Sequence, residues 1–284
     1  MNRVSAVKII GSIGLVISML LNGCTTNSIT DDNVSGNDLT ATEVIRLMGN
    51  GINLGNTLEA YNHKSYVELG VDPTSFETLW GQPVTTRDMI DDMKAMGFDT
   101  LRIPVAWTNG INYESGDYTI DERLMNRVDQ VVNYALDADM YVILNEHWDG
   151  SWWGMFGSAD EAVREKGMAL YKSMWTQISE HFSDYSYKLI FESANEELCH
   201  RLNDSDVTGT EGVLSEDECY ETTNRINSEF VKLVRSTGGK NADRFLLIAG
   251  YNTDFRKTCD DRYQMPEDLS LIHISEPTRH SLIS

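Results

Sequence analysis

A carboxylate and an amide group follow a short apolar segment in the second half of the chain. The segment is Ile190-Phe191, and the polar residues behind it are Glu192 and the pair Asn195-Glu196. A carboxyl group just beyond a buried strand loses hydration, which raises its pKa and suits it to act as a general acid. Asn195 offers a hydrogen bond to a substrate hydroxyl. Taken alone, an Asn-Glu pair is more typical of helix capping, so its meaning depends on the elements around it.

Five short apolar segments have the compact, bounded character of buried parallel strands. They cover residues 52–54, 100–103, 141–144, 189–191 and 245–248. Longer segments between them have the spacing of amphipathic helices, over residues 86–96, 124–138, 162–182 and 222–234. For the first of these helices we expect Thr85 or Thr86 as N-cap and Gly97 just past the end. The Met and aromatic positions of these helices are typical of a core and carry no chemistry.

The alternation of strands and helices predicts an α/β protein with a parallel sheet and helices outside it. A (β/α)8 TIM barrel and a doubly wound sheet both fit this alternation. Polar residues follow nearly every strand, namely Asn53, Asn56, Arg102, His147, Asn195, Glu196 and Asn252. Such residues at the carboxyl ends of successive strands favour the barrel. No G-x-G-x-x-G follows the first strand, which weakens the dinucleotide-binding alternative.

Five segments, in the same order, resemble motifs of glycoside hydrolase family 5, the clan A cellulases. They are Gly51-Ile52-Asn53-Leu54-Gly55-Asn56-Thr57-Leu58-Glu59, Trp80-Gly81-Gln82-Pro83, Gly97-Phe98-Asp99-Thr100-Leu101-Arg102-Ile103-Pro104-Val105-Ala106-Trp107, Asn145-Glu146-His147-Trp148-Asp149-Gly150 and Phe191-Glu192 through Asn195-Glu196. The resemblance runs from about Gly51 to Tyr251. It implies a glycosidase on a (β/α)8 barrel, with no metal and no organic cofactor.

The resemblance also implies roles for individual residues. Glu196 is the proton donor and acid/base, and Asn195 binds the 2-hydroxyl of the sugar. Arg102 lies below the nucleophile, keeps it ionised and orients it, and His147 lines the subsite of the reacting sugar. Asn56 is a further substrate-binding candidate. The family often has a second His where this chain has Trp148, so that contact is altered.

Several tryptophans are candidates to stack on the apolar faces of sugar rings. They are Trp107, Trp148, Trp152 and Trp153. Core packing is the alternative explanation for each of them. Likewise, a buried salt bridge would explain Arg102 and a buried core position His147 if the family were set aside.

The mechanism that the resemblance implies is retaining hydrolysis, which needs a second carboxylate about 5 Å from the first as nucleophile. In the family this Glu ends the seventh strand, and we find no counterpart in this chain. We therefore expect a domain over residues 41–268 that is a barrel truncated after about five strands. As it stands, such a fragment should have negligible activity, because its sheet edges and core are open.

The last segment, residues 269–284, is predicted to be non-native. Its run Leu269-Ser270-Leu271-Ile272-His273-Ile274-Ser275-Glu276-Pro277-Thr278-Arg279 resembles the translation of a common sequencing-library adapter. The alternative is a genuine strand over residues 271–274. On the adapter interpretation, His273 is not the family's sixth-strand His, and the natural protein continues beyond Asp268.

The first 23 residues have the pattern of a bacterial lipoprotein signal peptide. Arg3 and Lys8 precede an apolar run over residues 9–21, which is too short for a confident membrane span. The run ends in Leu21-Asn22-Gly23-Cys24, which resembles a lipobox, with Cys24 as the lipidated residue; an ordinary secretory leader is the alternative. Residues 24–40 are rich in Thr, Ser, Asn, Asp and Gly and are expected to form a flexible tether.

Cysteine usage fits an exported protein, in which disulfides persist. Cys199 and Cys219 flank a polar stretch, so a bridge between them is plausible and would leave Cys259 unpaired. No Cys/His spacing resembles a structural zinc site.

The composition limits the classes of partner. The chain has 284 residues, of which 41% are hydrophobic and 24% charged, as in globular proteins. Its formal net charge of −21 excludes a nucleic-acid partner, which would require a basic face. A neutral polysaccharide fits, although acidic surfaces also keep proteins soluble. We expect a monomer that contacts a membrane only through its lipid, at the cell surface or outer membrane.

These observations favour an endo-β-1,4-glucanase that acts on β-glucan. A mannanase, xyloglucanase or lichenase of the same family remains open. From another class, a non-catalytic glycan-binding lipoprotein on a degenerate barrel also remains open, and the intact Asn195-Glu196 and Arg102 argue against it.

The lipobox predicts that the mature protein begins at Cys24 and carries lipid on this residue. Mass spectrometry of the native N-terminus should find a lipidated Cys24 as the first residue. An unmodified N-terminus at another position would contradict this prediction.

Overall fold

A computed structural model describes residues 39–63, 66, 68, 70–147, 149–150, 152–268 and the backbone of 271–274. The signal peptide, Cys24, most of the tether and Trp148 lie outside the described residues, as do residues 275–284 of the C-terminal segment. None of the described helices is both long and apolar enough to cross a membrane.

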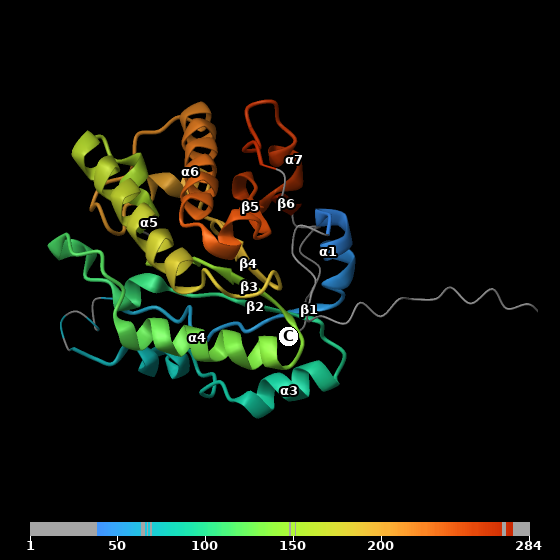
Figure 1. The fold of residues 1–284 in the computed structure, drawn as a ribbon. Helices are drawn as coiled ribbons and strands as arrows, with labels where there is room; N and C mark the ends of the chain where they lie inside the picture. Colours follow the sequence, from blue (N-terminus) through green and yellow to red (C-terminus); the bar gives the residue numbers. More distant parts are fainter. Residues whose placement is uncertain are drawn as a thin grey trace, which may run out of the picture. The chain divides into compact units, whose positions relative to one another are not determined.

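Six strands of the described chain form one parallel sheet in chain order, each hydrogen-bonded to the next (Figure 1). They are β1 (Gly51–Asn53), β2 (Thr100–Ile103), β3 (Tyr141–Asn145), β4 (Leu189–Glu192), β5 (Leu246–Ala249) and β6 (Leu271–Ile274). Consecutive parallel strands need crossover connections, and these are mostly helical. The prediction of a partial (β/α)8 barrel is confirmed.

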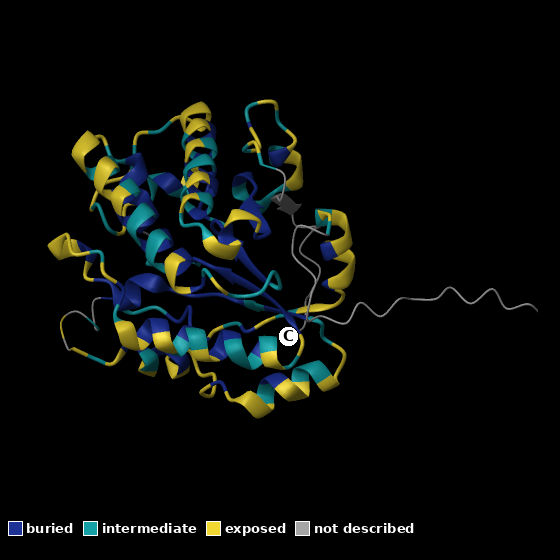
Figure 2. Ribbon diagram, in the orientation of Figure 1, coloured by how far each residue is buried: buried dark blue, intermediate teal, exposed yellow. Residues whose placement is uncertain are grey.

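The helices lie around the strands (Figure 1). The α-helices are α1 (Ala41–Leu47), α3 (Arg87–Ala95), α4 (Glu122–Asp137), α5 (Glu161–His181), α6 (Glu216–Ser236) and α7 (Phe255–Thr258). Short 3-10 helices occupy the loops: η3 (Pro73–Thr78), η4 (Trp107–Gly110), η5 (Tyr113–Ser115), η6 (Trp152–Gly157), η7 (His200–Asn203), η8 (Gly239–Ala242) and η9 (Tyr251–Thr253). Figure 2 shows that β3, β4 and β5 are buried and that the outer faces of the helices are exposed.

Helix boundaries follow from capping residues. Thr86 caps α3, as predicted, by accepting a hydrogen bond from the backbone N–H of Met89, and Gly97 follows this helix with a φ of 95°. Helix α6 begins six residues before the predicted boundary at residue 222. Ser215 and Glu218 form a capping box there, which lengthens the helix by stabilising its first turn.

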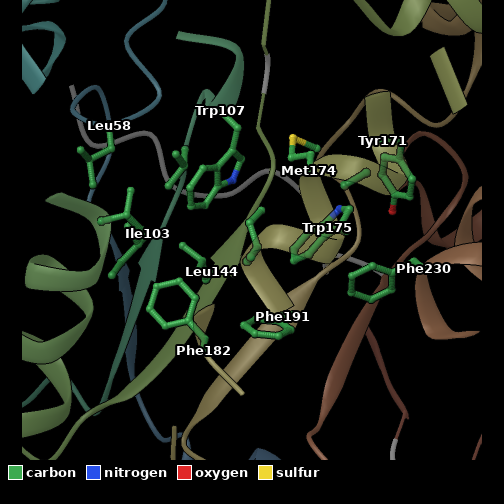
Figure 3. Close-up of a cluster of buried hydrophobic side chains, with 14 of the residues drawn as sticks. Leu58, Ile103, Trp107, Leu144, Tyr171, Met174, Trp175, Phe182, Phe191 and Phe230 are labelled. Carbon is green, nitrogen blue, oxygen red and sulfur yellow. The ribbon is translucent and has the colours of Figure 1, made fainter. Parts of the chain in front are cut away.

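The alternation of side chains along the strands divides the core into two clusters. One face of the sheet, with Ile103, Leu144 and Phe191, packs against the helices in the larger cluster (Figure 3). The opposite face contributes Tyr141, Ile143, Ile190 and Leu247 to a smaller cluster, together with Val44 and Met48 from the N-terminal segment. Since successive strand residues point to opposite faces, Arg102 and Glu192 share the face of the smaller cluster.

Two features of the fold differ from the sequence predictions. Helix α1 was not predicted, and the last two residues of the predicted tether belong to the fold: Thr40 forms a capping box with Glu43, and Leu39 packs against the smaller core cluster. The structure also has a sixth strand, β6, which pairs with β5 inside the segment predicted to be non-native. The predicted adapter origin of residues 269–284 stays a prediction.

Candidate active site

Arg102 is the centre of a hydrogen-bonded network at the carboxyl ends of three strands. Its Nε and Nη2 atoms donate to the two carboxylate oxygens of Glu192 at 2.7 and 2.8 Å. Nη2 also donates to Asn195 Oδ1 at 2.9 Å, and Nη1 donates to Asn53 Oδ1 at 3.4 Å. The guanidinium group therefore connects β2 with the end of β1 and with β4 and the loop after it.

The ion pair between Arg102 and Glu192 is largely removed from water. Their side chains are 19% and 11% exposed, and the contact is bidentate. A planar guanidinium with two matched N–H groups fixes a carboxylate in position and direction, which a lysine does not. The predicted buried salt bridge of Arg102 is thus present, with Glu192 as its partner.

Asn195 and Glu196 lie in the loop that follows β4. The Asn195 carbonyl oxygen accepts from Arg102, so its amide Nδ2 is directed elsewhere, and no described residue accepts from it. Glu196 forms an ion pair with Arg201 Nη2 at 3.6 Å. The Glu196 side chain is 41% exposed, so the prediction that it is buried in the free protein is wrong. This loop places the carboxyl group at the surface beyond the strand end, where a ligand has access to it.

His147 follows β3, and its ring contacts Asn145, with Nδ1 at 3.2 Å from the Asn145 amide. Loss of hydration and the positive charge of Arg102 lower the pKa of His147 to about 3. The imidazole is therefore neutral at physiological pH and serves as a hydrogen-bonding group rather than as a cation. His147 thus lies just past the end of β3 and interacts electrostatically with Arg102, while its role in lining a sugar subsite stays a prediction.

The tryptophans give a different result from the prediction. Trp107 is fully buried, donates its indole N–H to the backbone oxygen of Asn145 at 2.9 Å and belongs to the larger core cluster (Figure 3). Trp152 and Trp153 are also buried, with ring centroids 4.5 Å apart. Because none of the three exposes a ring face, the stacking role predicted for them is not supported, and core packing explains all three.

Asn56 is exposed in a turn behind β1 and adopts a left-handed conformation with φ of 62°. Its backbone N–H donates to the carboxylate of Glu59, which also accepts from Thr57. The side chain that reaches Arg102 is Asn53 instead. Asn56 is therefore fixed by its backbone, and no described contact brings its side chain into the network.

The predicted bridge between Cys199 and Cys219 is absent from the structure. Both are free thiols, buried in one cluster with Tyr220, Tyr251 and Tyr263. Cys199 Sγ donates to the backbone oxygen of Glu196 at 3.4 Å, and Cys219 Sγ accepts from Asn203 at 3.9 Å. Burial raises the pKa of each thiol to about 11, which keeps both protonated. The thiols thus act here as small buried groups that support the loop.

Three buried carboxyl groups close to this network were not predicted as a group. Glu146 and Asp149 follow β3, and Glu197 follows the candidate acid. Among the three, only Glu146 has a sequence position that indicates burial, because it directly follows an apolar strand. The described residues contain no group of three His, Cys, Asp or Glu side chains arranged to hold a metal ion.

The sequence matches the family "Cellulase (glycosyl hydrolase family 5)" over residues 63–275. It is 38% identical over 233 residues to an endoglucanase A of Clostridium longisporum, covering 82% of this chain and 42% of the relative. It is 36% identical over 241 residues to a xyloglucan-specific endo-beta-1,4-glucanase of Bacteroides ovatus, covering 85% and 45%. The chain thus spans less than half the length of each of these two relatives.

Solved structures give the same result for the fold. A broad-specificity endoglucanase from Ruminococcus champanellensis with bound cellotriose superposes with a TM-score of 0.70 at 36% identity, covering 83% of this chain and 65% of that one. A mutant of a Prevotella bryantii glycoside hydrolase family 5 enzyme, in complex with a xyloglucan tetradecasaccharide, gives 0.67 at 32% identity, covering 83% and 65%.

The environment of His147 predicts that its ring stays neutral at pH values well below the usual pKa of a histidine. In an NMR titration of the purified protein, the His147 ring signals, assigned by comparison with His147→Gln, should not move between pH 8 and pH 5. An unfolded His binds a proton near pH 6.5, so this site should lower stability as the pH falls from about 6.5 towards 3. A midpoint for His147 near 6.5 would contradict the described environment.

Proposed function

Because the chain belongs to glycosyl hydrolase family 5, the cellulase family, we propose that the complete protein is a retaining endo-β-1,4-glucanase that hydrolyses β-glucan polysaccharides. The observation that carries the proposal is the placement of Asn195-Glu196 beside the buried pair of Arg102 and Glu192. The Clostridium longisporum and Ruminococcus champanellensis relatives are endoglucanases by name, which supports the same substrate class.

In this proposal Glu196 is the acid/base. A retaining enzyme first protonates the leaving glycosidic oxygen and then uses the same group to deprotonate water. The partial exposure of Glu196 leaves its carboxyl group accessible to a glycosidic oxygen. Arg201, at 3.6 Å, is near enough to orient the carboxyl group between the two steps.

Asn195 supplies a donor to the sugar next to the scissile bond. Arg102 occupies its carbonyl oxygen, which fixes the direction of the amide and leaves both Nδ2 hydrogens for a substrate hydroxyl. A hydrogen bond to the 2-hydroxyl that strengthens in the transition state contributes to catalysis in retaining glycosidases. Neutral His147 offers a further hydrogen-bonding group at the end of β3.

The nucleophile must be a second carboxylate about 5 Å from the acid/base. Glu192 is an unsuitable candidate, because Arg102 binds both of its carboxylate oxygens and its side chain is 11% exposed. We therefore do not assign the nucleophile to Glu192.

Xyloglucan is the second candidate substrate. The Bacteroides ovatus relative is named for this specificity, and it is about as similar to the chain as the endoglucanases are. Initial rates of the complete protein on carboxymethylcellulose, xyloglucan, lichenan and mannan distinguish these candidates. A non-catalytic glycan-binding protein would bind one of these polymers and hydrolyse none of them.

For the location we propose a lipid anchor at Cys24 with the catalytic domain exported as a monomer. The lipobox pattern and the polar segment behind it support this arrangement. Insoluble polysaccharide cannot enter a cell, so a hydrolase for it must act outside the cytoplasm.

The acid/base assignment predicts the effect of Glu196→Gln in the complete protein. The amide keeps the size of the side chain but has no proton to donate, so the rate on an unactivated β-glucan should fall about 10²–10⁴-fold. On an aryl glycoside, whose leaving group needs little protonation, the first step should lose less. Azide should restore turnover and yield a glycosyl azide of retained configuration, detectable by NMR.

Glu211→Gln is the matched control, because Glu211 is exposed in a loop, and it should keep full activity. Full activity of Glu196→Gln on unactivated glucan, together with loss of activity in Glu192→Gln, would show that the acid/base is assigned to the wrong residue.

A further inference from the structure

Glu146, Asp149 and Glu197 form a group of buried carboxyl groups behind the loop that carries Glu196. Their residues are 0%, 0% and 1% exposed. Glu146 and Asp149 follow β3, Glu197 follows β4, and these strands are neighbours in the sheet. Asp149 and Glu146 are within hydrogen-bonding reach of each other, and Glu146 and Glu197 interact electrostatically.

Each carboxyl group receives hydrogen bonds from neutral donors. Asp149 accepts from the backbone N–H of Thr108 at 2.9 Å and from its hydroxyl group. Glu146 Oε1 accepts from the indole N–H of Trp152 at 3.3 Å. Glu197 Oε2 accepts from the backbone N–H of Asn195 at 2.9 Å. None of these donors carries a charge that could balance three buried carboxylates.

One oxygen of each glutamate lacks a donor in the part of the chain that the structure describes. These atoms are Glu146 Oε2 and Glu197 Oε1, and both are fully buried. A buried acceptor without a donor costs stability, whereas a proton on one carboxyl group would turn it into a donor for another. A proton also removes the repulsion between like charges in a site without water, because a protonated carboxyl group is neutral.

Other ionisable groups facing the cluster do not replace that proton. Tyr171 on α5 lies near Glu146, but its hydroxyl donates to the backbone oxygen of Ser193. Near Glu197 lie Glu196, which adds negative charge, and the cation Arg201. Arg201 is already in an ion pair with Glu196. The thiol of Cys199 is protonated and donates to the backbone of Glu196.

We propose that Glu146, Asp149 and Glu197 hold at least one proton among them in the native protein, and that this cluster positions the Asn195-Glu196 segment for catalysis. The second half of the proposal rests on the proposed glucanase function. Glu197 accepts a hydrogen bond from the backbone N–H of Asn195 and so acts as a positioning residue. Asp149 interacts with Glu146 and completes the cluster.

The shared proton gives the site a pH dependence with a definite sign. Burial raises the pKa of Asp149 to about 7 and of Glu197 to about 8, and raises the pKa of Glu146 well above its ordinary value. The folded protein thus binds more protons than the unfolded chain between about pH 4.5 and 8. The stability from this cluster is complete below about pH 4.5 and is lost as the pH rises through 7 to 8.

The experiment uses Glu146→Gln in the complete protein, because glutamine is a permanently neutral mimic of the protonated acid. Its amide should donate to a neighbouring carboxylate of the cluster, as the protonated acid does. Relative to the unmodified protein, the melting temperature should rise by several degrees at pH 8.5 and change little at pH 5. The alkaline limit of kcat on β-glucan should move to higher pH. If Glu146→Gln folds poorly, Glu197→Gln tests the same cluster.

Glu77→Gln is the matched control, because Glu77 is equally buried but is neutralised by Arg127 at 2.6 Å. This substitution breaks an ion pair and should lower the melting temperature at both pH values. To test positioning, Glu197→Ala should lower kcat about tenfold with little change in KM, and Glu197→Gln should restore kcat at pH 5.

Two outcomes would overturn the proposal. If both glutamine variants lower the melting temperature at pH 8.5 at least as much as at pH 5, the cluster holds no proton. If Glu197→Ala keeps full kcat, the cluster does not position the acid. Absence of glucan hydrolysis in the unmodified protein would contradict the proposed function alone, because the melting experiment tests the proton without any substrate.

Discussion

The bidentate ion pair between Arg102 and Glu192 is the interaction on which the arrangement of the site depends. Hydrogen bonds within a parallel sheet fix strands relative to their neighbours, yet they do not orient the side chains that project beyond the strand ends. Arg102 does this for three strands at once, because its guanidinium group binds Glu192, Asn195 and Asn53. A buried pair of this kind tolerates the loss of neither partner, since the other would remain as an uncompensated charge.

The charge of Arg102 also determines what its neighbours can do. It neutralises Glu192, directs the amide of Asn195 and contributes to keeping His147 neutral. At the ends of β3 and β4, Glu146, Asp149 and Glu197 have no comparable cation among the described residues and depend on protons instead. The site thus contains two ways of burying carboxylates, while the Glu196 side chain remains 41% exposed.

The sequence predicts the architecture well because strands and helices leave local signals. Each of the five predicted strands and four predicted helices is present, since apolar alternation, helical periodicity and a cap such as Thr86 are readable without tertiary information. Helix α1 escaped prediction because it has only seven residues and one fully buried side chain, Val44. The strand at Leu271–Ile274 matches the alternative that its β-like pattern offered.

For the candidate site, the sequence likewise predicts some features and not others. Motif order places Arg102, His147, Asn195 and Glu196 together, but it does not say which residue Arg102 binds or how exposed Glu196 is. The sequence does not distinguish a tryptophan that faces a substrate from one that faces the core. Trp107 faces the core. Glu146 and Glu197 are 51 residues apart in the sequence, so their proximity depends on the pairing of β3 with β4.

A double-mutant cycle on kcat/KM for β-glucan hydrolysis by the complete protein tests the central role of Arg102 and Glu192 most directly. Arg102→Lys retains the charge but loses the planar fork, and the resulting displacement of Asn195-Glu196 should lower kcat/KM about 10²-fold. If the pair acts as one unit, adding Glu192→Gln to Arg102→Lys should cost little more than either change alone. Strictly additive losses, or full activity in Arg102→Lys, would contradict this account.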